Sequence, residues 1–239
     1  MDKQVLPKIV VLTGAGISAE SGIRTFRDSG GLWEEHNIMD VATPEGWKRN
    51  PELVTRFYNA RRTQLLTVKP NDAHIALTKL QSYFDVKVVT QNVDDLHERA
   101  GNQGVLHLHG ELIKARSERY LDLVYEIGYR DILMGEKCEK GYQLRPQIVW
   151  FGEDVPLIVD ASHWVSKADI LIVVGTSLNV YPAAGLLYHA PYGCEKYLVD
   201  PGDLQVENLF RLRHIKTTAG EGVPALVEEL IGRYFPSAD

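Results

Sequence analysis

Short runs of apolar residues, many of them β-branched, recur along the chain. They are KIVVL at 8–12, VKVVT at 86–90, DILIVVG at 169–175, KYLVD at 196–200 and HIKTT at 214–218. Runs that are apolar nearly throughout are typical of strands buried on both faces of a parallel sheet. Residues 51–68, 71–84 and 223–235 have the periodicity of amphipathic helices. Strands that alternate with helices predict an α/β fold in which helices cover both faces of a parallel sheet.

Two segments interrupt this alternation. Residues 28–50 are polar and rich in Trp and Gly, and residues 112–147 combine tyrosines and charges with little periodicity. We expect these insertions to build a smaller lobe or lid over one edge of the sheet. The expected division of a single domain, residues 1–239, is a larger part of 1–27, 85–111 and 148–239 and a smaller lobe of about 28–84 and 112–147.

The composition disfavours several classes of protein. With 44% hydrophobic and 24% charged residues the chain is typical of a soluble globular protein. Its net charge of -6 disfavours general binding of nucleic acid, which requires clustered Lys and Arg. Cys138 and Cys194 are the two cysteines, and their separation fits neither a disulfide framework nor a metal knuckle. No apolar run approaches the roughly 18 residues of a membrane span. We therefore expect a cytoplasmic monomer.

A glycine-rich turn, GAGISA at 14–19, follows the first apolar run. It has the G-x-G-x-x-G/A spacing with which backbone amides approach the pyrophosphate of a dinucleotide, and it follows a strand as that motif requires. Arg24 or Arg27 would add a charge-assisted contact to the phosphates. Glycines at such turns also serve packing alone, and the acidic residue that ends the second strand in dehydrogenases is missing. The motif by itself leaves the ligand open.

Polar residues also follow three other predicted strands. They are Gln91-Asn92-Val93-Asp94, Gly175-Thr176-Ser177 and Asp200-Pro201-Gly202. Open α/β sheets bind ligands at the carboxyl ends of their strands, and hydroxyl, amide and carboxylate groups suit the ribose and carboxamide of a nucleotide. Each stretch alone is more typical of an ordinary turn. Their shared position at the sheet edge favours a binding site.

Two histidines, His107 and His109, stand two residues apart on a segment expected to be extended. Residues at this spacing face the same side of a strand, so they are candidates for two ligands of a metal. The sequence offers no evident third ligand. General acid or base catalysis by one of the two histidines is the better interpretation.

Several motifs together resemble those of the sirtuins, the NAD-dependent protein-lysine deacylases. In chain order they are GAGISAESGI with Phe26-Arg27, TQNVDDLHERAG at 90–101, LHG at 108–110, IVWFGE at 148–153 and GTSLNVYPAA at 175–184. The resemblance covers nearly the whole chain. It implies a Rossmann-type large domain, a smaller inserted lobe and NAD in the cleft between them. It also implies that the acyl oxygen of a modified lysine attacks the ribose carbon that bears nicotinamide, which yields free lysine, nicotinamide and O-acyl-ADP-ribose.

The resemblance assigns roles to the matching residues. His109, the histidine of the LHG motif, would be the catalytic base, Asn92 would be a second catalytic residue, and His107 would be structural. Asp200 stands where the family more often has Asn. The implied cofactor-binding residues are Gly14, Ala15, Gly16, Ser18, Ala19, Glu20, Thr25, Phe26, Arg27, Trp33, Gln91, Asn92, Val93, Asp94, Gly175, Thr176, Ser177, Asp200 and Ala219.

The resemblance also implies where a protein substrate binds. An extended peptide would pair by strand addition with the segment from Val149 to Glu153, with Asn179 to Tyr181 on its other side. The implied peptide-binding residues are Val149, Phe151, Gly152, Glu153, Asn179, Val180 and Tyr181. The acyl-lysine would then enter a narrow apolar tunnel.

Tyr58 and Arg61 stand three residues apart and project from one face of the helix predicted at 51–68. By itself such a pair is typical of a solvated helix face. Within the resemblance it matches the Tyr-x-x-Arg of the sirtuin branch that removes succinyl, malonyl and glutaryl groups, since a phenol and a guanidinium bind a carboxylate well. Ala42 matches a small residue of that branch that leaves room for a longer acyl chain, and Arg24-Thr25 resembles its bacterial members. We expect desuccinylase and demalonylase activity above deacetylase activity.

The smaller lobe departs from the common sirtuin pattern, in which two Cys-x-x-Cys pairs bind a structural zinc. In the matching segment, 115–145, Cys138 is the one thiol, and one thiolate cannot complete a tetrahedral site. We expect no zinc. The lobe would instead be held by apolar contacts of Tyr120, Leu121, Leu123, Val124, Tyr125, Ile127 and Tyr129.

Two other functions compete with deacylation. A Rossmann dehydrogenase or methyltransferase is disfavoured by the missing acidic residue and by the LHG and FGE segments, which neither enzyme needs. A non-catalytic module that senses NAD or ADP-ribose would keep the glycine turn but tolerate the loss of His109, Asn92 or Asp94. All three are present.

Overall fold

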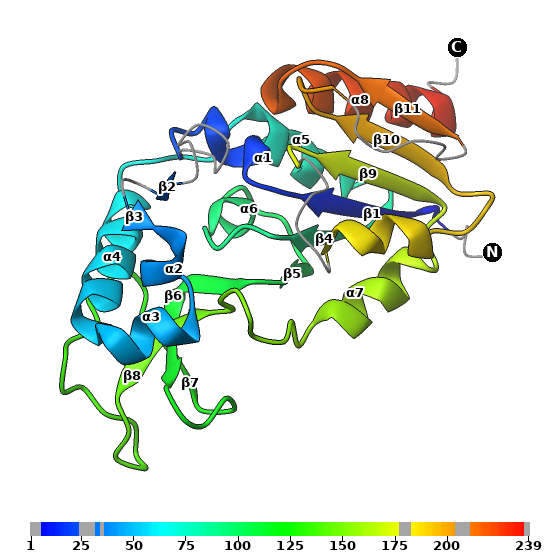
Figure 1. Ribbon diagram of the computed structural model, residues 1–239. Helices are drawn as coiled ribbons and strands as arrows, with labels where there is room; N and C mark the ends of the chain where they lie inside the picture. Colours follow the sequence, from blue (N-terminus) through cyan, green and yellow to red (C-terminus); the bar gives the residue numbers. More distant parts are fainter. Residues whose placement is uncertain (1–5, 24–31, 34–35, 177–182, 204–210, 237–239) are drawn as a thin grey trace.

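The computed structural model describes residues 6–23, 32–33, 36–176, 183–203 and 211–236 (Figure 1). Its main sheet has six strands in the order β11-β10-β9-β1-β4-β5, and every neighbouring pair is parallel. The strands are β1 (Lys8–Thr13), β4 (Asp85–Thr90), β5 (Val105–His107), β9 (Ile170–Val174), β10 (Glu195–Val199) and β11 (Leu212–Ile215). This is the doubly wound order of Rossmann-type folds, in which the direction of winding reverses between β1 and β9.

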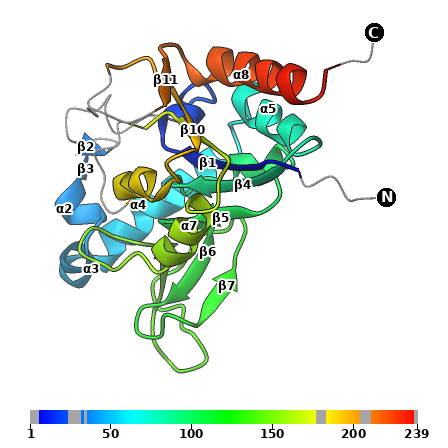
Figure 2. The ribbon, with the colours of Figure 1, turned by 90° about the vertical axis from the view of Figure 1, so that its right-hand side faces the viewer.

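Helices cover both faces of this sheet (Figures 1 and 2). One face carries α5 (Asp72–Leu80) and α8 (Ala219–Tyr234), and the other carries α7 (Ile158–Val165) and the 3-10 helix η1 (Ala183–His189). Alternate residues of β1 serve the two layers: Ile9 and Val11 pack on the first, and Val10 and Leu12 pack on the second. A strand between two helical layers is therefore apolar at successive positions, which confirms the predicted fold class.

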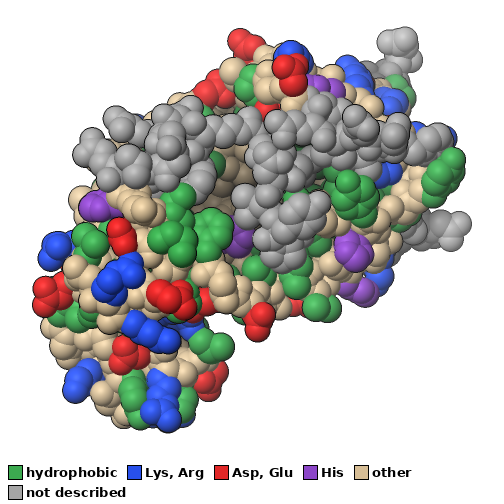
Figure 3. Space-filling view, in the orientation of Figure 1, with side chains coloured by type: hydrophobic (Ala, Val, Ile, Leu, Met, Phe, Trp, Pro, Cys, Tyr) green, Lys and Arg blue, Asp and Glu red, His purple; other side chains and the backbone are tan. Residues whose placement is uncertain are grey.

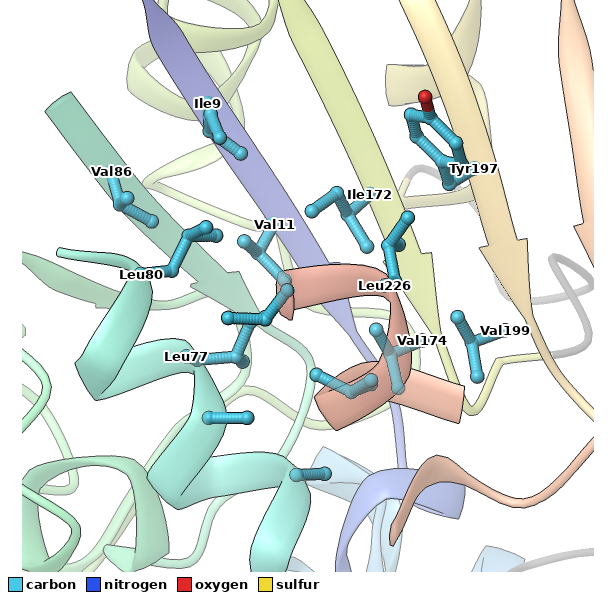
Figure 4. Packing of buried hydrophobic residues seen from close by; sticks show 14 of the residues in the cluster. Ile9, Val11, Leu77, Leu80, Val86, Ile172, Val174, Tyr197, Val199 and Leu226 are labelled. Carbon is cyan, nitrogen blue, oxygen red and sulfur yellow. The ribbon is translucent and has the colours of Figure 1, made fainter. Parts of the chain in front are cut away.

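Figure 4 shows the interior of the first layer. Leu77 and Leu80 of α5 and Leu226 of α8 pack in one cluster with Val11 and Ile172 of the sheet, and each of the three leucines is at most 1% exposed. Full burial of such a side chain stabilises a fold by about 1.5–3 kcal/mol relative to leaving it exposed. This layer holds the sheet in place and, with it, the loops at its carboxyl edge.

Helix α5 corrects part of the expected division of the chain. The sequence predicts that residues 28–84 belong to the smaller lobe, but α5 packs against α8 on the main sheet. The reason is that Ala73, Leu77 and Leu80 form one apolar face of α5, and this face is buried in the core of the sheet. The first insertion therefore ends before α5.

Other predicted elements differ from the structure at their ends. The strand expected at 214–218 is β11 at Leu212–Ile215, and the helix expected at 223–235 begins earlier, at Ala219, with Pro224 inside it. The sequence predicts an extended segment around His107 and His109 but no strand with the bounds of β5, and it predicts no helix at α7. Strand β5 spans only three residues, too few to show a pattern.

The smaller lobe combines short helices with an antiparallel sheet. Its helices are α2 (Ile38–Val41), α3 (Pro44–Arg49) and α4 (Pro51–Gln64), its sheet has the order β7-β6-β8, and the strands are β6 (Gly110–Ser117), β7 (Val124–Glu126) and β8 (Leu144–Ile148). A separate two-stranded ribbon pairs β2 (Leu32–Trp33) with β3 (His36–Asn37). On the face shown in Figure 3, the Lys and Arg side chains of this lobe are interspersed with Asp and Glu.

Local sequence explains where the helices of this lobe begin. The side chain of Thr43 accepts a hydrogen bond from the Gly46 amide at the start of α3, and Asn50 accepts one from the Leu53 amide at the start of α4. A proline follows each cap, at the first helical position, where no amide hydrogen is needed. The 51–68 prediction thus corresponds to α4, which ends at Gln64.

The end of the smaller lobe around β7 has an apolar cluster of its own. Buried in it are Ala115, Ile127, Ile132, Cys138 and Leu144, with Leu123, Tyr125 and Tyr142 packed against them. The rings of Tyr120 and Tyr142 meet edge to face, with centroids 5.5 Å apart. Leu121, Val124 and Tyr129, which the sequence predicts to contribute, are exposed and are not part of this cluster. In β7 the side chains alternate, so Tyr125 faces the cluster and Val124 faces solvent.

No described helix is long and apolar enough to cross a membrane.

Candidate active site

The glycine-rich turn after β1 leads into α1 (Gly16–Ala19) and packs directly against the turn after β9. The Gly16 amide donates to the Gly175 carbonyl oxygen at 2.8 Å. A Cβ on Gly16 would lie 2.6 Å from the Cα of Gly175, and a Cβ on Gly14 would lie 2.7 Å from the Cβ of Thr176. Gly175 has a φ of +61°, in the left-handed region. The glycines are required for this close contact, and they leave bare backbone at the point where the strand order reverses.

A buried network joins this turn to the turn after β4. Ser18 Oγ donates to Asp94 Oδ2 and accepts from the side-chain amide of Asn92, both at 3.0 Å. Ser18 is fully buried, and Asn92 and Asp94 are 8% and 5% exposed. Burial raises the pKa of Asp94, although hydrogen bonds from the Leu96 amide and Ser18 oppose the rise. Three of the predicted cofactor residues therefore form one connected group.

Gln91 connects the same turn to the turn after β9. Its side-chain amide donates to Thr176 Oγ1 at 3.3 Å, and its backbone amide donates to the Thr13 carbonyl oxygen at 2.9 Å. Val93, two residues on, packs against the core of the smaller lobe. The polar groups after β1, β4 and β9 thus converge on one edge of the sheet.

His109 lies beside Gln91, between β5 and β6. Its Nδ1 is 3.0 Å from the Gln91 carbonyl oxygen. Because a carbonyl oxygen only accepts hydrogen bonds, Nδ1 carries the proton and Nε2 of the neutral ring presents a lone pair. Burial lowers the pKa of His109 by more than the bond to Gln91 raises it. The ring is therefore neutral at pH 7, with one basic nitrogen, as a general base requires.

His107 has different surroundings. Its Nδ1 lies 2.9 Å from the Asn92 carbonyl oxygen, and its Nε2 lies 2.9 Å from Glu98 Oε1. Burial disfavours the charged ring, but the Glu98 carboxylate outweighs burial and raises the pKa of His107. His107 thus holds the backbone of Asn92 in place. The two histidines bind separate partners, and no group of three His, Cys, Asp or Glu side chains among the described residues is arranged to hold a metal ion.

Buried side chains beneath the site were not singled out by the sequence. Thr13 Oγ1 donates to Thr90 Oγ1 at 2.8 Å and lies 3.0 Å from Nε2 of His97, a residue of α6 (Leu96–Arg99). Thr90 Oγ1 also accepts from the Asn92 backbone amide at 3.0 Å. Burial lowers the pKa of His97 far below its usual value, so this ring is neutral. The sequence feature that could have identified this group is the threonine at the end of both β1 and β4, because each threonine places a hydroxyl at the carboxyl edge of the sheet.

The residues expected around the acyl group gather in the core of the smaller lobe. Ala42, Phe57, Tyr58 and Trp150 belong to one buried cluster. The Trp150 indole donates to the Tyr58 hydroxyl oxygen at 3.0 Å. Arg61 is 6% exposed, and its Cζ lies 6.0 Å from the centroid of the Phe57 ring. Burial raises the pKa of Tyr58, while the bond from Trp150 and the charge of Arg61 oppose the rise. Tyr58 and Arg61 therefore lie in the interior and not on a solvated face.

The segment after β8 is held between two parts of the site. The Val149 amide donates to the His109 carbonyl oxygen at 2.9 Å, and the Phe151 amide donates to the Ala42 carbonyl oxygen at 3.0 Å. The Phe151 side chain is 49% exposed. Gly152 beside it has a φ of +89°, and a Cβ added to Gly152 would meet no atom within 4 Å. This segment therefore presents a surface next to His109.

Glu153 faces inward, away from that surface. Its carboxylate accepts from Arg116 at 2.9 Å, from Arg145 at 2.8 and 3.1 Å, and from the Trp150 amide at 2.8 Å. These charge-assisted bonds anchor the segment to β6 and β8. Strand pairing with a peptide would use the backbone of the segment and not this carboxylate.

Three further predicted cofactor residues lie near the start of α8 and the end of β10. Glu20 accepts hydrogen bonds from the Gly220 amide at 2.6 Å and from the Thr218 hydroxyl at 3.1 Å. Its carboxylate thereby caps α8, whose first amides have no partner within the helix. Ala219 is buried at that helix start. Asp200 Oδ1 accepts from the Gly202 amide at 2.8 Å, as in an Asx turn.

The remaining predicted residues are less completely described. Ala15 and Ala19 lie at the two ends of α1, and Ala19 is exposed. Trp33 is described as a residue of β2 that pairs with His36 of β3. Outside the described residues lie Thr25, Phe26, Arg27, Ser177, Asn179, Val180 and Tyr181.

Comparison with known proteins identifies a family and several relatives of this chain. The model of the Sir2 family matches residues 14–182. The NAD-dependent protein deacylase of Bacteroides thetaiotaomicron is 53% identical over 232 residues, which are 95% of this chain and 99% of that protein. The NAD-dependent protein deacylase of a Helicobacter pylori strain is 55% identical over 196 residues, which are 82% of this chain and 85% of that protein.

Solved structures agree with the sequence relatives. A mutant Sir2 homologue in complex with ADP-ribose is 35% identical to this chain and superposes with a TM-score of 0.88, over 97% of this chain and 95% of that one. A Sir2 homologue in complex with NAD is 37% identical, with a TM-score of 0.85, over 95% of this chain and 90% of that one. The chain therefore belongs to the Sir2 family.

Proposed function

We propose that this chain is an NAD-dependent protein-lysine deacylase that removes succinyl and malonyl groups and, more weakly, acetyl groups. The reaction consumes one water, and its products are free lysine, nicotinamide and O-acyl-ADP-ribose. Relatives named NAD-dependent protein deacylase, at 53% and 55% identity, support the general activity. The observation that carries the acyl preference is the burial of Arg61, a cation, among aromatic side chains next to Tyr58.

The donor set at the carboxyl edge of the sheet fits NAD. Bare backbone at Gly14 to Gly16 suits a pyrophosphate, and the hydroxyl, amide and carboxylate groups of Ser18, Asn92 and Asp94 suit a ribose and a carboxamide. We assign the glycine turn and Thr176 to the phosphates and adenosine, and Gln91, Asn92 and Asp94 to the nicotinamide half. When bound, NAD supplies an electrophilic ribose carbon as nicotinamide leaves.

His109 is the base in this proposal. The Gln91 carbonyl oxygen orients its ring, and burial keeps Nε2 unprotonated at neutral pH. His109 removes a proton from a ribose hydroxyl, directly or by relay, so that the sugar can take over the acyl group. Asn92 is held by Ser18 through its side chain and by Thr90 through its backbone amide, and these bonds fix the residue that we assign to the reacting sugar.

Tyr58 and Arg61 provide the acyl preference. A buried guanidinium beside a phenol offers several hydrogen-bond donors to a carboxylate, and such charge-assisted bonds are strong where water is excluded. A succinyl or malonyl group ends in that carboxylate, whereas an acetyl group ends in a methyl. Ala42 is 2% exposed in the same cluster and contributes only one methyl there.

Incubation with NAD and a succinyl-lysine peptide tests the activity. We expect release of nicotinamide that requires both NAD and the peptide. A module that only senses NAD or ADP-ribose would bind the nucleotide in calorimetry and release no nicotinamide in the presence of the peptide, and that outcome would contradict the proposal.

Substitution of Arg61 by Met tests the acyl preference. Because the charged hydrogen bonds to the acyl carboxylate are lost, we expect kcat/KM for a succinyl peptide to fall about 10- to 100-fold, while kcat/KM for an acetyl peptide changes by less than about 3-fold. Arg56→Met is the matched control, because Arg56 is exposed on the same helix. Equal losses on the two peptides in Arg61→Met would refute the acyl assignment.

A further inference from the structure

Trp150 lies at the centre of a set of contacts that the proposed chemistry leaves unused. It is 2% exposed and comes from the segment after β8. Its indole N–H nevertheless reaches the hydroxyl of Tyr58 on α4, across a sequence separation of 92 residues. The bond joins the peptide-binding segment to the helix that carries the proposed acyl-binding pair.

The chemistry of the two groups fixes the direction of this bond. An indole N–H donates and cannot accept, so the Tyr58 oxygen is the acceptor. The phenol proton must then point away from Trp150, towards another acceptor. Burial raises the pKa of Tyr58, which keeps the phenol protonated and able to donate. Tyr58 and Arg61 stand three residues apart on one face of α4 and are both buried, and the charge of Arg61 acts on the phenol, so a carboxylate bound by Arg61 would lie near this proton.

The indole is itself held on several sides. The Cζ of Arg145 lies 3.2 Å from the centroid of the Trp150 ring, and the rings of Trp47 and Tyr58 lie 5.8 and 6.4 Å from it, measured between centroids. Arg145 is bound by Glu153, and Glu153 also accepts from the Trp150 backbone amide. A side chain held in this way has little freedom left to lose when an acyl group binds, so its N–H is preorganised.

We propose that Trp150 is a positioning residue for acidic acyl groups: by donating to Tyr58, it orients the phenol proton towards the acyl carboxylate that Arg61 binds. This inference rests on the proposed function. Trp150 acts through Tyr58 and not by contact with the carboxylate. Its effect is therefore confined to acyl chains that end in a hydrogen-bond acceptor.

Trp150→Phe removes the N–H and keeps an aromatic ring. We expect the KM for a succinyl peptide to rise about 3- to 10-fold with little change in kcat, because one ordinary hydrogen bond stops supporting the bound state. Both constants for an acetyl peptide should stay within about 2-fold of the wild type. Trp164→Phe is the control for loss of an indole N–H: Trp164 packs against the second layer of the main sheet, outside the cluster of Tyr58 and Trp150, and its change should leave the succinyl-to-acetyl ratio unchanged.

A double-mutant cycle with Tyr58→Phe isolates the coupling. If Trp150 acts through the Tyr58 hydroxyl, Trp150→Phe in the Tyr58→Phe background should cost no further succinyl activity. Additive losses, or equal losses on succinyl and acetyl peptides in Trp150→Phe, would overturn the inference. Should Trp150→Phe fold poorly, 3-benzothienylalanine at position 150 keeps the bicyclic shape with sulfur in place of N–H, and the same results are expected.

Failure of the inference is distinguishable from failure of the proposed function. A wild-type enzyme without succinyl preference, or an Arg61→Met enzyme that loses both activities equally, contradicts the acyl assignment whatever Trp150 does. If the wild type prefers succinyl and Arg61→Met abolishes the preference, equal effects of Trp150→Phe on the two peptides contradict only the role of Trp150.

Discussion

His107 and His109 stand two residues apart, and their surroundings set their pKa values in opposite directions. His107 lies against the Glu98 carboxylate, which raises its pKa, whereas His109 is buried with a single backbone carbonyl as partner, and its pKa is lowered. One ring is thereby stabilised as a cation that holds the backbone of Asn92, and the other is kept neutral. The difference arises from neighbours that are distant in the sequence.

The lowered pKa of His109 predicts the acid limb of the pH profile. A base must be unprotonated to act, so activity is complete well above its pKa and falls as the pH drops through it. Because burial places the pKa of His109 below its usual value of 6.5, kcat/KM for a succinyl peptide should hold down to pH 6.5 and decline only at lower pH.

The measurement is kcat/KM as a function of pH, with urea unfolding at each pH to separate titration from loss of the fold. An acid-limb midpoint at about pH 7 or above would show that His109 has the wrong environment for the role proposed here.

The sequence predicts single residues well where they share a position at strand ends. Ser18, Asn92 and Asp94 are expected at one edge and meet there through 3.0 Å hydrogen bonds. Contacts that depend on side-chain direction are not predictable in this way. The indole of Trp150 reaches Tyr58 across 92 residues, and no local pattern in either segment indicates it.

At the scale of elements, the sequence predicts the strands that are buried on both faces with accurate bounds, whereas the partly buried edge strand β11 is predicted at 214–218 and lies at Leu212–Ile215. β1, β4, β9 and β10 lie between two helical layers and are therefore apolar at successive positions. The short strand β5 is flanked on one side only, by β4, and its three residues include a histidine. Helix α5 shows the limit of a periodic pattern, since its apolar face is visible in the sequence but the partner of that face is not.

The two turns that meet after β1 and β9 give a test at this scale. Gly16→Ala would place a Cβ 2.6 Å from the Cα of Gly175, so we expect it to destabilise the fold by about 1–3 kcal/mol. Gly232→Ala is the matched control: Gly232 lies in α8 with no atom within 4 Å of its Cβ position, so the change should stabilise the fold by about 0.4–1 kcal/mol.

Urea unfolding of both variants provides the measurement. A Gly16→Ala protein as stable as Gly232→Ala would mean that the two turns separate easily, and that the glycines are not required for their packing.

At the scale of the whole molecule, two parts with separate cores meet at the site. The main sheet has a helical layer on each face, while the smaller lobe is built around the cluster that contains Tyr58 and Trp150, with a second cluster beyond it. In that second cluster, Cys138 is buried with Ile127, Ile132 and Leu144, and its Sγ lies 3.5 Å from Ser117 Oγ. The described contacts of this region are therefore those of a small apolar cluster.

We predict that the purified protein contains far less than one zinc per chain and that a chelator does not lower its melting temperature. The physical reason is that a single thiolate, at Cys138, cannot form a closed zinc site. Elemental analysis of the protein, purified without added metal, and thermal unfolding with and without EDTA check this. One zinc per chain, lost together with stability on chelation, would contradict it.

Two backbone hydrogen bonds connect the segment after β8 to two different parts of the site. Val149 is tied to the carbonyl of His109, and Phe151 is tied to the carbonyl of Ala42. A protein that binds to this segment as proposed would thus contact a stretch of chain that is bonded at one point to His109, the proposed base, and at another to Ala42 of the proposed acyl-binding cluster. Docking of the target protein, orientation of the base and arrangement of the acyl-binding residues would then be coupled through the same stretch of backbone.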